Sequence, residues 1–206
     1  MKKIFLFTII LSLNIYAVNV STFDIKGIKL GDNPNLIRSK IPNLEIVNAS
    51  EYNMGHYIMW MRNNNINDSL VISLTHIEKV SEIRRIKKFR TKVNFNKIKK
   101  QLFRKYGKPR VKGYAAFNNN EGFAYAFCWG SCKKINISNK YWNGYSVENT
   151  WKEKSLIVKY SYFLNVNEIS FLLRDEKAIY KDDKWLNKKS LKEEKEKIER
   201  ESNIDL

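Results

Sequence analysis

The sequence predicts an α+β protein with two similar halves, each a short helix packed on an antiparallel sheet, followed by a charged C-terminal helix. Short runs of alternating apolar and polar residues recur along the chain, which is typical of strands with one buried face. Two other segments combine a capping asparagine with apolar residues at helical spacing. From residue 175 onward the composition changes to charged helix formers.

The first 17 residues have the organisation of a secretory signal peptide. Two lysines follow Met1, an apolar run occupies residues 4–13, and the small residue Ala17 closes the segment. A membrane-spanning helix needs about 20 apolar residues, more than this run supplies. No cysteine follows the run to carry a lipid. We therefore expect cleavage after Ala17 and a mature chain in the periplasm or outside the cell.

Residues 18–92 form the predicted first half. Asn33 and Pro34 are typical of a helix cap and first turn, and Pro42 ends the short helix that follows. Asparagines 63–65 predict a turn between two strands of a hairpin. The predicted strands cover residues 23–31, with a kink at Gly27, residues 57–62, residues 69–76, and, as a bulged strand, residues 79–90.

Residues 93–174 form the predicted second half. Asn94 caps a helix that runs to Tyr106, with apolar side chains on one stripe and lysines and arginines elsewhere, and Gly107 ends it. Strands are predicted at residues 111–117, 122–129, 145–151, 155–164 and 168–173, with a loop at 139–144. Residues 175–206, with ten acids and nine bases, predict a charged helical tail that frays after about Lys195.

The segment Phe123-Ala-Tyr-Ala-Phe-Cys-Trp-Gly-Ser-Cys132 contains both cysteines of the chain. Phe123, Tyr125 and Phe127 point to one side of an extended backbone, and Cys128 points to the other. An exported protein with two cysteines favours a structural disulfide between Cys128 and Cys132. A redox pair, a metal site and free thiols are the alternatives. Two thiolates without a nearby histidine are too few for a closed zinc site, so we expect no metal.

Two short motifs resemble a known family. Gly27-Ile-Lys-Leu-Gly31 before a short helix, followed by the strand at residues 57–60, is similar to the opening of small envelope proteins of the SmpA/OmlA (BamE) type. Lys105-Tyr-Gly-Lys-Pro109 resembles the helix ending of the same proteins, and tandem copies resemble the beta-lactamase-inhibitor protein fold. The resemblance implies a helix on antiparallel strands in each half. Asp32-Asn-Pro34 stands where the family has Met-Thr.

Positive charge is concentrated in residues 79–112, which contain fifteen Lys and Arg residues and one acid, Glu82. After removal of the first 17 residues the chain keeps 36 basic and 21 acidic residues, a net charge of +15, so this segment accounts for nearly all of the excess. The segment is either an ordinary solvated surface or an electrostatic patch for an anionic partner. An exported protein rarely meets nucleic acid, so we expect none. The residues expected to contact the partner are Arg84, Arg85, Lys87, Lys88, Lys97, Lys99, Lys100, Arg104 and Lys105.

The sequence shows no catalytic motif, and we predict no catalytic residue and no cofactor. His56 and His76 are the only candidates for a base at neutral pH, and both are interpreted as structural. The leading hypothesis is an exported, non-enzymatic binding protein of the inhibitor or immunity type. Its partner would be an envelope protein or an anionic lipid or glycan, with peripheral membrane contact. A cell-wall hydrolase and a thiol-disulfide protein are the alternatives.

Overall fold

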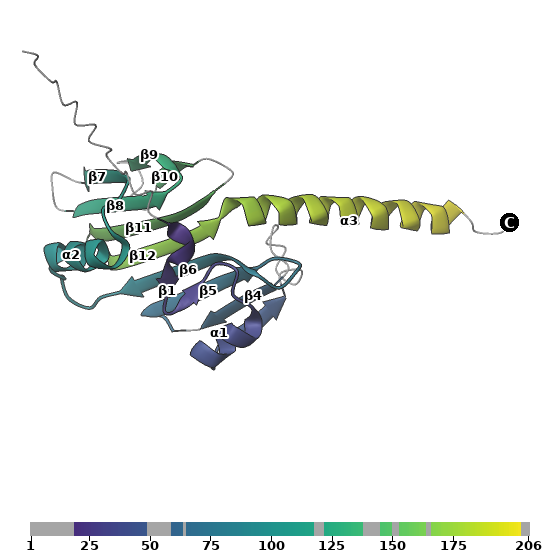
Figure 1. Ribbon diagram of the computed structural model, residues 1–206, viewed down its shortest axis with the longest axis horizontal. Coiled ribbons are helices and arrows are strands. Elements are labelled where there is room, and N and C mark those ends of the chain that lie inside the picture. Colours follow the sequence, from purple (N-terminus) through teal and green to yellow (C-terminus); the bar gives the residue numbers. More distant parts are fainter. Residues whose placement is uncertain are drawn as a thin grey trace, which may run out of the picture.

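The computed structural model confirms the α+β class: in the part of the chain that it describes, three α-helices accompany an eight-stranded antiparallel sheet with strand order β3-β4-β5-β6-β12-β11-β8-β7 (Figure 1). The structure describes residues 19–48, 59–63, 65–117, 122–137, 145–149, 153–163 and 166–202. The predicted signal peptide, His56 and the predicted loop at 139–144 lie outside these ranges.

The described chain begins with a short 3-10 turn, η1 (Val20–Thr22), and a two-stranded hairpin of β1 (Asp24–Ile25) and β2 (Ile28–Lys29). The sequence predicted one kinked strand here, and this was wrong. Lys26 and Gly27 both have positive φ, 54° and 80°, so the chain reverses direction between the two strands. A two-residue turn with positive φ at both positions matches the twist of a hairpin.

The next elements are α1 (Pro34–Lys40) and a meander of β3 (Glu45–Asn48), β4 (Met59–Asn63), β5 (Asp68–Leu74) and β6 (Val80–Lys88). Asn33 caps α1 by accepting a hydrogen bond from the Leu36 backbone N–H at 3.0 Å, as its position predicted. The predicted hairpin is β4 paired with β5. The predicted bulge is a register shift between β5 and β6 at Ser73 and Leu74.

The chain continues through α2 (Phe95–Tyr106), β7 (Val111–Phe117), β8 (Gly122–Gly130), β11 (Lys154–Phe163) and β12 (Val166–Asp175). Strand β12 lies between β6 and β11, so the last strand of the chain is near the middle of the sheet. Two strands form a separate hairpin, β9 (Cys132–Ile137) and β10 (Tyr145–Asn149), beside β7 and β8. The sequence did not predict β9.

The main core lies on one face of the sheet, which we call the helix face. Side chains from α1, α2 and the β1–β2 hairpin pack there against alternate residues of the strands. Trp129 is fully buried in this core, and its indole Nε1 donates a hydrogen bond to the Gly107 carbonyl oxygen at 2.9 Å. This bond ties the end of α2 to β8. A smaller cluster around the two cysteines occupies the opposite face.

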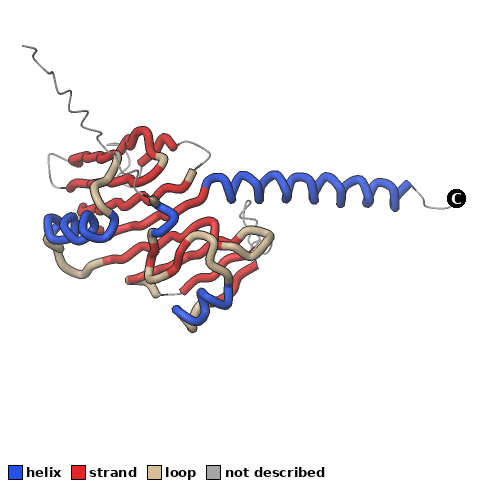
Figure 2. The backbone as a smooth tube through the Cα atoms, viewed as in Figure 1, coloured by secondary structure: helices blue, strands red, loops and turns tan. Residues whose placement is uncertain are grey.

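The C-terminal helix α3 (Glu176–Ser202) starts directly after β12 and extends away from the sheet (Figure 2). Its first turns pack on the body, where Ile179 and Asp182 are buried, whereas every residue from 187 to 200 is exposed. The sequence predicted fraying after about Lys195, but the helix continues to Ser202. Ion pairs one turn apart, Lys189 with Glu193 and Lys192 with Glu196, support the exposed part.

Candidate anion-binding surface

Helix α2 supplies the core of the candidate site. Its apolar stripe faces the sheet, with Leu102 and Tyr106 buried, and this packing places the basic residues on the outer side. The Asn94 side chain caps the helix by accepting a hydrogen bond from the Lys97 backbone N–H at 3.2 Å. Gly107, with a φ of 76°, ends the helix and donates its N–H to the Phe103 carbonyl oxygen.

The outer side of α2 carries unbalanced positive charge. Lys97, Lys100 and Arg104 line an open, shallow depression of about 430 Å³, together with polar side chains of the same helix. The helix contains no acidic residue. Within the described part of the chain, none of these three cations forms an ion pair. We call Lys97, Lys100 and Arg104 the basic side of α2.

A second, smaller groove of about 180 Å³ lies on the other flank of α2, where the helix meets β1, β6 and β12. Its cations are Lys26, Arg85 and Lys105, and each of them forms an ion pair with a carboxylate. Lys105 pairs with Asp24, with Nζ to Oδ1 at 3.0 Å. Burial alone would raise the pKa of the Asp24 carboxyl, but hydrogen bonds from Lys105 and the Gly27 N–H outweigh it and lower that pKa.

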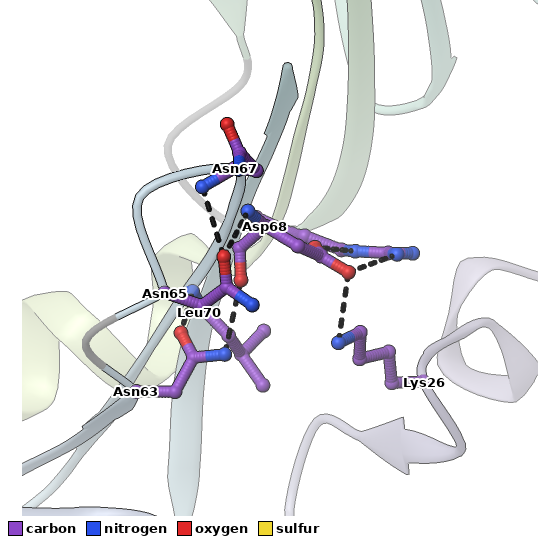
Figure 3. A network of polar contacts seen from close by, with 7 residues as sticks. Lys26, Asn63, Asn65, Asn67, Asp68 and Leu70 are labelled. Atoms are coloured by element: carbon purple, nitrogen blue, oxygen red, sulfur yellow. Dashed lines mark hydrogen bonds and ion pairs between the residues drawn. The ribbon is translucent and has the colours of Figure 1, made fainter. Parts of the chain in front are cut away.

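Asp68 is the anionic centre of this groove. The Arg85 guanidinium donates to both carboxylate oxygens, at 2.7 and 2.9 Å, and Lys26 reaches Asp68 Oδ2 from the β1–β2 turn at 3.0 Å (Figure 3). These contacts, with the Arg85 hydrogen bonds first, lower the pKa of Asp68 from 3.8 to about 2. Arg85 is therefore a structural cation that joins β6 to β5.

Asparagines hold the turn that presents Asp68. The Asn65 side-chain oxygen accepts hydrogen bonds from the backbone N–H groups of Asn67 and Asp68, at 2.9 and 3.2 Å. Asn63 accepts from the Leu70 N–H at 2.7 Å and donates to the Asp68 carbonyl oxygen at 2.9 Å (Figure 3). The predicted asparagine turn thus fixes the start of β5 through side-chain bonds to the backbone.

The nine cations predicted to bind the partner do not form one surface. Cα partners in antiparallel strands share a face, so the pairing of Arg84 with Leu172 places Arg84 opposite the helix face. Lys88 lies on the same side as Arg84, while Arg85 and Lys87 lie on the helix face. Arg84 also pairs with the buried carboxylate of Glu82, at 3.1 Å. Of the nine, the structure brings together the basic side of α2, with Lys99 and Lys105 on the same helix.

The predicted disulfide between Cys128 and Cys132 is present, with Cα atoms 6.1 Å apart. It spans the tight turn from β8 into β9. Gly130 is required at this turn, because its φ is 87° and an added Cβ would lie 2.3 Å from the Lys154 carbonyl oxygen. Both cysteines are fully buried, so neither sulfur is open to an external thiol. This burial supports the structural interpretation of the pair.

His76 packs against α3. Its backbone N–H donates to Asp182 Oδ1 at 2.8 Å, its ring Nδ1 contacts the same oxygen, and its ring stacks on Trp185 with centroids 4.3 Å apart. Among the described residues, ring Nε2 has no hydrogen-bond partner. Asp182 is almost completely buried. The cluster fastens the first turns of α3 to the loop after β5.

Sequence reasoning missed Lys159, which is buried opposite the helix face on β11. Burial lowers the pKa of its ammonium group, and the Glu168 carboxylate partly offsets this effect. The sequence gives only a weak indication of this burial. Side chains alternate along a strand, so a lysine between Val158 and Tyr160 in β11 points to the face of the sheet opposite theirs. No group of acidic, histidine or cysteine side chains suited to a metal occurs in the described ranges.

Comparison with family models, with curated proteins and with solved structures finds no match for this chain. Nor is any helix within the described ranges long and apolar enough to cross a membrane.

Proposed function

We propose that this chain is an exported, non-enzymatic binding protein that uses the basic side of α2 to recognise an anionic partner in the cell envelope. The observation that carries the proposal is the contrast in charge pairing between two helices. Two lysines of α3, Lys189 and Lys192, pair with glutamates one turn away, whereas α2 has five cations and no acid. Unpaired cations on a rigid helix attract anions over roughly 8–10 Å at ordinary salt.

The arrangement of like charges on α2 has an energetic cost. Lys97 and Lys100 are three residues apart, and Lys100 and Arg104 are four apart, so both pairs are neighbours on the helix surface. Each such pair destabilises a helix by about 0.2–0.5 kcal/mol. Lys97 also lies in the first turn, where the helix dipole disfavours a cation. A binding role explains why cations occupy positions that helix stability disfavours.

The two alternatives have less support. A thiol-disulfide role requires an accessible sulfur, and both sulfurs are buried. A hydrolase needs a base aimed at a substrate. His76 has an orienting carboxylate in Asp182, but its ring is stacked under Trp185.

We also propose that the chain consists of two similar halves. A helix followed by four strands of the main sheet occurs twice, as α1-β3-β4-β5-β6 and as α2-β7-β8-β11-β12, and the last strands of the two runs are neighbours. The β9–β10 hairpin is then an insertion in the second half. Superposition of the two runs in an experimental structure tests this proposal, and helices on opposite faces of the sheet would refute it.

The function is tested by removing the charge of the basic side of α2. A variant with Lys97→Gln, Lys100→Gln and Arg104→Gln is compared with the mature chain for binding to anionic vesicles, an acidic polysaccharide and an acidic peptide, each at two salt concentrations. Three exposed ion pairs at about 0.5 kcal/mol each correspond to roughly a tenfold loss of affinity. The dependence of this affinity on salt concentration should fall as well.

The matched control removes the same charge from α3, by Lys181→Gln, Lys188→Gln and Lys195→Gln, at exposed positions of the helix. We expect this control to bind within about twofold of the unmodified chain. Equal losses in the two triple variants would show that net charge, and not the basic side of α2, determines binding.

A further inference from the structure

Four aromatic rings form a continuous row across three strands on the helix face. They are Tyr114 on β7, Tyr125 and Phe123 on β8, and Tyr162 on β11. The centroids of Tyr114 and Tyr125 are 4.8 Å apart, those of Tyr125 and Phe123 are 5.5 Å apart, and those of Phe123 and Tyr162 are 5.5 Å apart. We call this row the aromatic strip.

The strip lies at the start of α2, whose first residue, Phe95, stacks on one of its rings, Tyr125. Phe127 and Trp129, farther along β8, are under the helix and only 4% and 0% exposed. Tyr114 is 58% exposed, and the other three rings of the strip are half-buried. An exposed tyrosine on an edge strand, joined to partly open rings, is more than packing requires, because a core aromatic gains by complete burial.

Positive charge lies at the Tyr162 end of the strip. The Lys92 ammonium lies 4.8 Å from the centroid of the Tyr162 ring. Phe95, the first residue of α2, stacks on Tyr125 with centroids 4.1 Å apart and planes 15° apart. This contact joins the strip to the start of α2, where Lys97 begins the basic side. Lys92 therefore lies at the Tyr162 end of the strip, and the strip meets α2 at Phe95, two residues before Lys97.

We propose that the strip and these cations bind an acidic polysaccharide, with a sugar ring lying on the exposed Tyr114 and carboxylate or phosphate groups on Lys92 and the basic side of α2. The electron-rich face of an aromatic ring attracts the slightly positive C–H groups of a sugar ring. The tyrosine hydroxyl groups supply hydrogen bonds to sugar hydroxyls. The inference depends on the proposed function and names the class of its partner.

Single-stranded nucleic acid is the other ligand that combines rings with negative charge. The geometry favours sugar, because neighbouring rings of the strip already touch and are tilted by 40°, 69° and 30° to one another. A flat base therefore cannot insert between them. Proteins that bind single strands present platforms on which successive bases stack. The strip instead offers a row of tilted rings on which a puckered ring can lie.

The test uses Tyr114→Ala, because this side chain is exposed and its loss leaves the core intact. The matched control is Tyr180→Ala on α3. Tyr180 is 54% exposed, and the Lys184 ammonium group lies over its ring. Binding is measured to polygalacturonate, to poly-L-glutamate and to oligothymidylate at one ionic strength. Tyr114→Phe is included because it keeps the ring.

We expect polygalacturonate to bind more tightly than the other two polymers. We expect Tyr114→Ala to weaken the binding of polygalacturonate about tenfold. The affinity of the same variant for poly-L-glutamate should change by less than twofold. Tyr114→Phe and Tyr180→Ala remain close to the unmodified chain. Melting temperatures of all variants within a few degrees of each other confirm that they are folded.

Three results would overturn the inference, and they are distinguishable. Equal affinity for polygalacturonate and poly-L-glutamate, unaffected by Tyr114→Ala, would leave the charge-based function standing and remove the sugar specificity. Tighter binding of oligothymidylate that depends on Tyr114 would assign the surface to nucleic acid. If no polyanion binds, the proposed function fails as well.

Discussion

Lys97→Glu is expected to make the protein more stable and its binding weaker. Lys97 is the third residue of α2, and Asn94 is the cap whose side chain accepts its N–H. A glutamate there can hydrogen-bond back to the Asn94 backbone N–H and complete a capping box. It also replaces a cation by an anion at the positive end of the helix dipole.

The magnitude follows from exposed helix positions. Reversing the charge near the helix N-terminus is worth about 0.5–1 kcal/mol, and converting the repulsion with Lys100 to attraction adds about 0.5 kcal/mol. The free energy of unfolding therefore rises by about 1 kcal/mol, and the melting temperature rises by roughly 2–4 °C for a chain of this size. Calorimetry at neutral pH measures this change.

Binding is measured with the same variant on the anionic probe that binds best. The substitution removes one positive charge and adds one negative charge at the basic side of α2, so affinity should fall about tenfold. Lys188→Glu on α3 makes the same change in net charge elsewhere and should leave affinity within about twofold. A Lys97→Glu protein that binds as well as Lys188→Glu, or that is less stable than the unmodified chain, would refute the reasoning.

Three further predictions concern the framework. The pKa of Asp68 in the folded chain is about 2, below 3.8, so the stability from its contacts is complete above about pH 4 and is lost as pH falls toward 2. When the free energy of unfolding is measured across this pH window, Asp68→Asn should lose about 1 kcal/mol less stability than the unmodified chain. The difference is this small because the site is partly exposed and screened by solvent. Identical titrations of the two proteins would contradict the assignment. Gly130→Ala should destabilise by more than about 2 kcal/mol in urea unfolding, since its Cβ meets the Lys154 carbonyl oxygen and its φ is positive, and an unchanged midpoint would count against this geometry. His76→Ala should increase amide exchange in the first turns of α3 while β8 stays protected, and uniform protection would show that His76 does not hold the helix.

The sequence was sufficient to predict elements whose signals are local. Asn33 and Asn94 marked the starts of the two short helices, and both make the expected capping bonds. Cys128 and Cys132 are only four residues apart and join across one turn, so their pairing could be predicted as well. The β1–β2 turn was missed because Lys26 takes a positive φ, which no general preference of lysine suggests.

The arrangement of the site could not be read from the sequence, because its decisive contacts join distant residues. Lys105 is neutralised by Asp24, 81 residues away, and His76 meets Asp182, 106 residues away. Arg84 and Arg85 are adjacent in the chain but point to opposite faces of β6. The predicted patch therefore separates into paired, structural cations and the unpaired basic side of α2. Local charge density shows where cations are, and only the fold shows which of them are already neutralised.

The position of β12 between β6 and β11 determines the order of folding. A chain synthesised only as far as residue 165 has no strand to place between the two halves of the sheet, so β6 and β11 each present an unsatisfied edge. Such edges recruit other chains. The sheet can close only after β12 has emerged, and its assembly depends on contacts between residues far apart in the chain, which slows folding. Nascent chains that stall before Val166 are therefore the species most prone to aggregate.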